Sequence, residues 1–167
     1  MAAAAARALR PASTAPVPET ALTALARARE ALTEAAMSAE PTRRYAAAHV
    51  AALRATAALL SVRTRPSRRG AQRNAWTLLA QVAPEMGEWA SFFSAGAGKR
   101  AAAEAGLDRQ VSTRDADDLV RDVERYLFLV QRALGIPYQP SLPTSAPLRE
   151  PAETDTGAGT NTGLEAS

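Results

Sequence analysis

PTRRYAAAHVAALRATAALL, residues 41–60, is the stretch that decides the fold, and its composition predicts one long helix. Eight of its twenty residues are alanine, which loses no side-chain entropy on entering a helix. Its larger side chains recur at steps of three and four positions: Tyr45, His49, Leu53, Thr56 and Leu60. That spacing is typical of a helix face turned toward a core. We therefore expect a helix that is capped at Thr42 and runs to about Val62.

The preceding segment predicts a partner helix that begins near Pro18 or Glu19. Its apolar residues also step by three and four: Leu22, Leu25, Ala28, Leu32 and Ala36. Pro41 is expected to end this helix, because the residue before a proline disfavours helical geometry. Two helices joined by so short a turn should pack as an antiparallel hairpin, and their many alanines allow close approach of the backbones.

Shorter helices are predicted in the middle of the chain. One covers residues 71–82, and Pro84 suits the first turn of the next, which carries the stripe Met86, Trp89, Ala90 and Phe93. The aromatic residues of this region are interpreted as core rather than as a ligand pocket: Trp76, Trp89, Phe92 and Phe93. GAGKRAAAEAG, residues 96–106, lacks the spacing of a phosphate-binding loop, so it predicts a turn into a short helix ended by Gly106.

The last helix has the clearest boundaries. STRD, residues 112–115, places a Ser/Thr cap ahead of acidic residues that favour the positive end of the helix dipole. A strong apolar stripe runs to Leu134, where Gly135 and Pro137 stop the helix. The acidic run DADD, residues 115–118, suggests a metal site as an alternative, but its confinement to one helical turn favours capping.

Together these segments predict an all-α fold, an up-and-down bundle of four longer helices plus a short helix. No segment shows the sustained alternation of a strand. Residues 1–18 and 138–167 are rich in Pro, Ala, Gly, Ser and Thr, and we expect both to be disordered because they cannot bury enough apolar surface. The helical domain is therefore placed at residues 19–137.

Composition excludes several chemistries. The chain has no cysteine and one histidine, so disulfides, thiolate sites and multi-histidine zinc sites are not available to it. We expect no metal and no small-molecule cofactor. The sequence has no run of 18 apolar residues and no long apolar core of a secretory signal near its start. A soluble cytoplasmic protein that does not cross a membrane is the expectation.

Basic charge is concentrated in the first half of the chain. Residues 1–73 carry 12 basic and 4 acidic side chains. RTRPSRRGAQR, residues 63–73, is a predicted loop whose arginines suit phosphate oxygens: Arg63, Arg65, Arg68, Arg69 and Arg73. A phosphate- or RNA-binding role is one interpretation of this loop. A solvated connection is the other, since no aromatic residue lies between the arginines to stack on bases.

The helical hairpin and the phrase RRYAAAHVAALRATAALL, residues 43–60, resemble the HEPN superfamily, and within it actinobacterial HEPN-domain proteins of unknown function. The resemblance covers roughly residues 19–135. It implies either a metal-independent ribonuclease with an Arg-x4–6-His motif, often completed in a homodimer, or a binding module without activity. In the first case Arg44 or Arg43 would stabilise the phosphorane charge, and His49 would transfer protons.

Helix geometry bears on that pair. Residues five apart on a regular helix differ in direction by about 140°, and residues six apart by about 120°. Neither Arg44 nor Arg43 would then share the face of His49. Three possibilities follow: the first turn is irregular, a second protomer supplies the arginine, or the histidine is packed in the core. We favour the last. The favoured function is a non-catalytic module that docks a protein partner or self-associates, with a HEPN ribonuclease and an RNA-binding accessory protein as alternatives.

Overall fold

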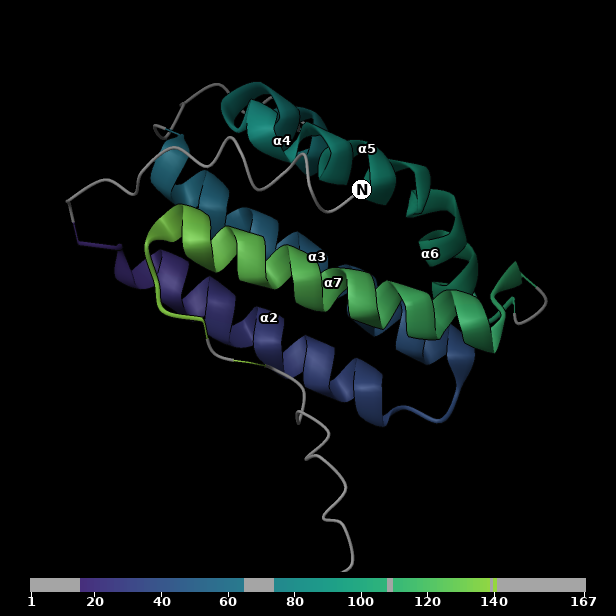
Figure 1. The fold of residues 1–167 in the computed structure, drawn as a ribbon. Coiled ribbons are helices and arrows are strands. Elements are labelled where there is room, and N and C mark those ends of the chain that lie inside the picture. The colour runs from purple at the N-terminus through teal and green to yellow at the C-terminus, as the bar shows by residue number, and fades with distance from the viewer. Residues whose placement is uncertain (1–15, 65–73, 108–109, 139, 141–167) are drawn as a thin grey trace, which may run out of the picture.

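A computed structural model of the chain describes residues 16–64, 74–107, 110–138 and 140, and these residues form helices without any strand. The elements in chain order are α2 (Glu19–Met37), α3 (Pro41–Arg63), α4 (Ala75–Val82), the 3-10 turn η1 (Pro84–Met86), α5 (Gly87–Ala95), α6 (Ala97–Glu104) and α7 (Thr113–Leu134). The predicted all-α bundle is confirmed (Figure 1). The predicted disordered segments, 1–18 and 138–167, fall almost wholly outside the described residues.

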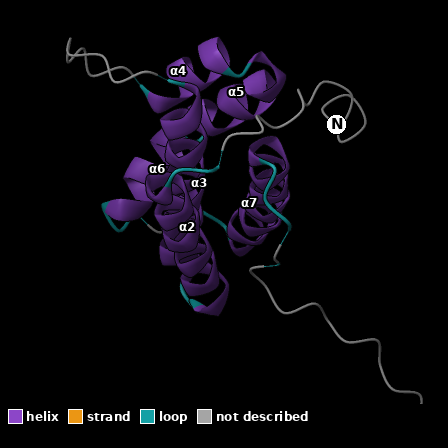
Figure 2. Ribbon diagram, turned by 90° about the vertical axis from the view of Figure 1, so that its left-hand side faces the viewer, coloured by secondary structure: helices purple, strands orange, loops and turns teal. Residues whose placement is uncertain are grey.

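The long helix α3 is the centre of the molecule. It packs against α2, α7, α6 and α4. Figure 1 shows α3 between α2 on one side and the α4–α5 pair on the other, and Figure 2 shows α7 flanking α2 and α3. The predicted hairpin of the first two helices is present as the α2–α3 pair. A side chain that is buried on α3 therefore faces one of these neighbours.

Helix lengths differ from the prediction in the middle of the chain. Three of the described helices are long, with 19, 23 and 22 residues, while α4, α5 and α6 have eight or nine each. The helix expected at 71–82 begins at Ala75, because the side chain of Asn74 caps it by accepting from the backbone N–H of Trp76. Pro84 starts a 3-10 turn before α5, since a proline has no N–H to continue the preceding helix.

The start of α3 also corrects the prediction. Pro41 is the first residue of α3 rather than the end of α2, which stops at Met37. Proline is favoured at the first helical position because its fixed φ suits the helix and its missing N–H would have no partner there. Thr42 is consequently inside the helix and buried, so it is not the cap that the sequence suggested.

The core combines small and large side chains. Five alanines of α3 are fully buried: Ala48, Ala51, Ala52, Ala55 and Ala58. On the α4–α5 side Trp76 and Phe93 are buried, as predicted. Phe92 was also predicted to be core, but it is 44% exposed, because adjacent residues on a helix point about 100° apart.

Among the described helices, α3 alone is long and apolar enough to span a membrane by length and composition. Half of its most apolar window is buried by the rest of the protein. The core helix of a soluble protein has the same properties, so this feature is compatible with a soluble chain.

Candidate functional site

His49 lies on the inward face of α3, as its spacing predicted, and its side chain is 1% exposed. Its Nε2 is 3.1 Å from the backbone carbonyl oxygen of Phe93 on α5. The rings of Trp76 and Phe93 meet the imidazole edge-on, with centroids 5.6 and 5.9 Å away. Because a carbonyl only accepts, Nε2 carries the hydrogen and Nδ1 is the unprotonated nitrogen. Nδ1 is buried and has no hydrogen-bond partner among the described residues.

The charge state of His49 follows from this environment. Burial lowers the pKa of His49 below its ordinary 6.5, and the Phe93 carbonyl only partly offsets that effect. Arg100 lowers the pKa further, while the backbone of His49 itself and Glu104 raise it by smaller amounts. The imidazole is therefore neutral near neutral pH, with its one N–H donor committed to the protein backbone.

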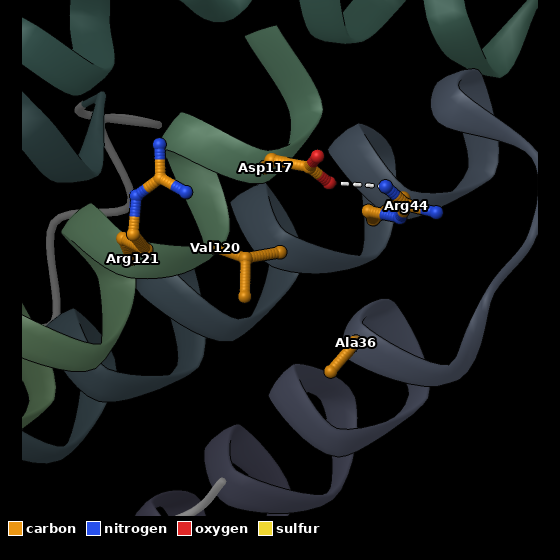
Figure 3. A pocket seen from close by; sticks show the side chains of 5 residues that line it. All are labelled: Ala36, Arg44, Asp117, Val120 and Arg121. Carbon is orange, nitrogen blue, oxygen red and sulfur yellow. Dashed lines mark hydrogen bonds and ion pairs between the residues drawn. The ribbon is translucent and has the colours of Figure 1, made fainter. Parts of the chain in front are cut away.

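Arg44 joins three elements at the other side of α3 (Figure 3). Its Nε and Nη2 donate to the backbone carbonyl oxygen of Ser38, at 3.0 and 2.8 Å, in the turn between α2 and α3. Its Nη1 donates to the carboxylate of Asp117 on α7. With 17% of the side chain exposed, Arg44 fixes this corner of the bundle. Arg43 instead lies on the surface and pairs with Glu34 of α2 at 3.1 Å.

The structure does not bring Arg44 or Arg43 together with His49. Since α3 is continuous from Pro41, the first turn has no irregularity that could redirect either arginine. Arg44 contacts the α2–α3 turn and α7, whereas His49 contacts α4 and α5. The sequence raised three possibilities for this pair. The first turn of α3 is regular, and His49 is buried in the core, as the third possibility expects. An arginine supplied by a second protomer stays a prediction.

Arg44 also lines an open pocket of about 290 Å³ between α2, α3 and α7 (Figure 3). The lining consists of Ala36, Arg44, Asp117, Val120 and Arg121. Two small apolar side chains face two guanidinium groups and one carboxylate. Both guanidinium groups already pair with carboxylates, Arg44 with Asp117 and Arg121 with Asp118. The two positive charges that line the pocket are therefore already paired within the protein.

The family model described as SAV_6107-like HEPN matches residues 35–131, which is more than half of the chain. The chain belongs to this HEPN family. No curated protein and no solved structure matched it. The matched region runs from the end of α2 into α7 and includes both Arg44 and His49. The resemblance seen in the sequence is thereby confirmed at the level of the family.

The acidic run at the start of α7 serves the HEPN fold itself. Ser112 and Asp115 form a reciprocal capping box, each side chain accepting from the other's backbone N–H at 3.0 Å. The hydrogen bond from Lys99, followed by those from Ser112, lowers the pKa of Asp115 to about 2. Asp117 pairs with Arg44. The capping interpretation is confirmed, and no group of three His, Asp or Glu side chains among the described residues is placed to hold a metal ion.

The basic loop is described only at its start. Arg63, at the end of α3, forms an ion pair with Glu85 of η1, whose side chain is 6% exposed. Arg63 therefore joins α3 to η1 in the HEPN domain and has a protein carboxylate as its partner. The other predicted phosphate-binding residues lie outside the described residues: Arg65, Arg68, Arg69 and Arg73.

An exposed aromatic site on α7 was missed by sequence reasoning. The ring of Phe128 is 36% exposed, and the guanidinium carbon of Arg132 lies 5.7 Å from its centroid. Tyr138, beyond the end of α7, packs edge-on against Phe128 with centroids 5.1 Å apart and donates its hydroxyl hydrogen to Glu124. The available signal was that Phe128 falls outside the inward stripe of α7, one residue after the buried Leu127. We call Phe128, Arg132 and Tyr138 the α7 aromatic site of the HEPN domain.

Proposed function

We propose that this HEPN domain is a non-catalytic interaction module of the cytoplasm that docks a second copy of itself or another protein. One observation carries the proposal: Arg44 and His49, the two residues of the possible catalytic pair, both make structural contacts within the protein. His49 is buried against Phe93 and Trp76, and Arg44 holds the α2–α3 turn to α7.

Proton transfer makes demands that this arrangement does not meet. A catalytic histidine must reach the ribose 2′-hydroxyl or the leaving oxygen within hydrogen-bond distance. The Nε2–H of His49 donates to a backbone carbonyl, and its Nδ1 is enclosed on the same face of α3. An arginine that stabilises a phosphorane needs N–H groups directed at the reacting phosphate. Three of the five N–H groups of Arg44 donate to protein oxygens in other directions.

The α7 aromatic site supports the docking half of the proposal. Aromatic residues and arginine are enriched at the centres of protein interfaces. Phe128 offers apolar area, while Arg132 and Tyr138 provide polar groups around it. The ring contacts hold these side chains in place before binding, which lowers the entropic cost of ordering them at an interface.

Incubation with single-stranded RNA in the presence of EDTA is expected to give no cleavage above a buffer control. The variants His49→Gln and Arg44→Lys should behave like the wild-type chain, and Arg43→Lys serves as an exposed control. The measurement is product length on a denaturing gel over a concentration series of protein. Cleavage that both His49→Gln and Arg44→Lys abolish, but Arg43→Lys retains, would establish the ribonuclease alternative. Cleavage common to all four proteins indicates a contaminating nuclease.

Docking is tested through the α7 aromatic site. Sedimentation velocity of the wild-type chain, from micromolar to about 100 µM, is expected to show reversible self-association. Phe128→Glu should raise the dissociation constant at least about tenfold, because it buries a charge against the partner. Leu22→Glu on α2, where the leucine is 39% exposed, is the matched control and should leave association unchanged. A wild-type monomer at every concentration would remove self-association and leave only a different protein as the partner.

A further inference from the structure

The side chain of His49 lies in the seam between α3 and the pair α4–α5, which the ion pair of Arg63 and Glu85 also joins. We define the seam as His49 of α3, Trp76 of α4, Phe93 of α5 and Gly96 after α5. A Cβ on Gly96 would lie 3.0 Å from the Tyr45 hydroxyl oxygen and 3.8 Å from the Cδ2 of His49, so the backbone packs tightly against the imidazole. The hydrogen bond from His49 to the Phe93 carbonyl crosses this seam.

The charged groups around His49 offer no free carboxylate. In α4, AWTLLAQV carries no charge, and the charge of α5, Glu88, is exposed in its first turn, away from Phe93. On α6, Arg100 and Glu104 pair with each other at 3.0 Å. On α3 the neighbour is the neutral Tyr45, whose own nearest charges, Lys99 and Asp115, form an ion pair at 2.8 Å.

A second proton on the imidazole of His49 is poorly compensated by its surroundings. Protonation at Nδ1 would make both ring nitrogens donors, and the new N–H would be buried with only the backbone of His49 itself to favour it. The resulting cation would lie between Trp76 and Phe93, removed from water. Buried charges are tolerated when they are paired, and here the nearest opposite charge is already paired. Water hydrates the imidazolium when the seam opens, so protonation shifts the equilibrium toward the open seam.

We propose that His49 is an acid-sensitive latch: its protonation releases the α4–α5 pair from α3 and from Tyr126 of α7, while the α2–α3–α7 bundle stays folded. The bundle has its own apolar core, which includes Leu25, Leu59 and Leu127, each at most 1% exposed. Its buried polar contact between Thr56 and Tyr126 joins two neutral hydroxyls, 2.8 Å apart. Release of the seam exposes Trp76 and Phe93. Acid would therefore expose apolar side chains that the closed seam buries.

The sign of the pH dependence follows from the two states. Water-exposed His49 titrates near 6.5, whereas burial lowers the pKa of His49 in the closed seam. The stabilisation of the closed seam is therefore complete above pH 6.5 and is lost as the pH falls toward the lower value. Within that window, uptake of one proton raises the opening constant by up to about tenfold per pH unit.

Amide hydrogen exchange of the full chain between pH 8 and pH 4.5 measures this opening. After correction for intrinsic rates, protection of α4 and α5 should fall by up to about tenfold per pH unit below 6.5, while α2 and α7 keep theirs. His49→Gln keeps a neutral donor for the Phe93 carbonyl and should remove this pH dependence. Equal pH profiles for the two proteins would overturn the latch, as would simultaneous loss of protection in α2 and α7.

A second measurement needs no variant at position 49. The chain has one histidine, so its imidazole gives a single set of NMR signals during a pH titration. Trp89→Phe leaves Trp76 as the remaining tryptophan, and its emission should shift to longer wavelength with the same midpoint as the histidine signal. A midpoint at or above 6.5, or a Trp76 emission that does not follow it, contradicts the proposal.

Discussion

Replacing Phe93 with alanine is expected to lower the free energy of unfolding by about 3–5 kcal/mol, the largest effect of any single truncation proposed here. The ring is 1% exposed and touches most of the aromatic residues of the core. Its centroid lies 4.9 Å from that of Trp76, 5.8 Å from Trp89 and 5.0 Å from Tyr126. Removing it leaves a cavity between α4, α5 and α7, which urea denaturation followed by circular dichroism would report as a lower midpoint.

Phe92→Ala is the matched control for this experiment. Phe92 is the neighbouring residue on α5 and loses the same atoms, but its ring is 44% exposed. Its truncation should cost about 1 kcal/mol or less, because the surrounding water already solvates much of the ring. Equal losses for Phe92→Ala and Phe93→Ala would contradict the assignment of Phe93 as the centre of this core.

The contrast between the two phenylalanines shows what sequence reasoning can reach. Helical spacing correctly placed Phe93, Trp76 and His49 on inward faces. Treating all the aromatic residues of this region as core placed Phe92 wrongly, because consecutive helix positions cannot face the same neighbour. Periodicity is local information, and it also failed at single positions: Leu22 and Ala36 belong to the predicted inward stripe of α2, but Leu22 is 39% exposed and Ala36 is exposed.

The partners of the candidate site residues were beyond the reach of periodicity. The Phe93 carbonyl that accepts from His49 is 44 residues along the chain, and the Asp117 that pairs with Arg44 is 73 residues away. From the sequence, Asp117 was explained by the helix dipole alone. Its pairing depends on the register of α7 against α3, which is set by packing of side chains that no local pattern fixes. The α7 aromatic site was missed for the same reason, since Tyr138 reaches Phe128 only after the chain turns back at Gly135.

Ala55→Leu is expected to lower the free energy of unfolding by about 1–3 kcal/mol, although leucine and alanine are both good helix formers. Ala55 is 0% exposed on the helix that contacts α2, α4, α6 and α7. Protein interiors are packed nearly as densely as organic crystals, so three added carbon atoms must displace a neighbouring helix or force a strained rotamer. The measurement is the urea midpoint, read together with the near-ultraviolet circular dichroism of the aromatic core.

Ala57→Leu separates packing from helix propensity. Ala57 is on the same helix, two residues further on, and is exposed, so the same substitution there should change stability by about 0.5 kcal/mol or less. A large loss at Ala55 with little change at Ala57 means that the alanines of α3 set how closely its neighbours approach. Equal small effects would mean that the alanines reflect helix propensity alone and that the seams around α3 have room. The closed seam at His49 depends on the first outcome, because a loosely packed α3 would admit water to Nδ1 without any protonation.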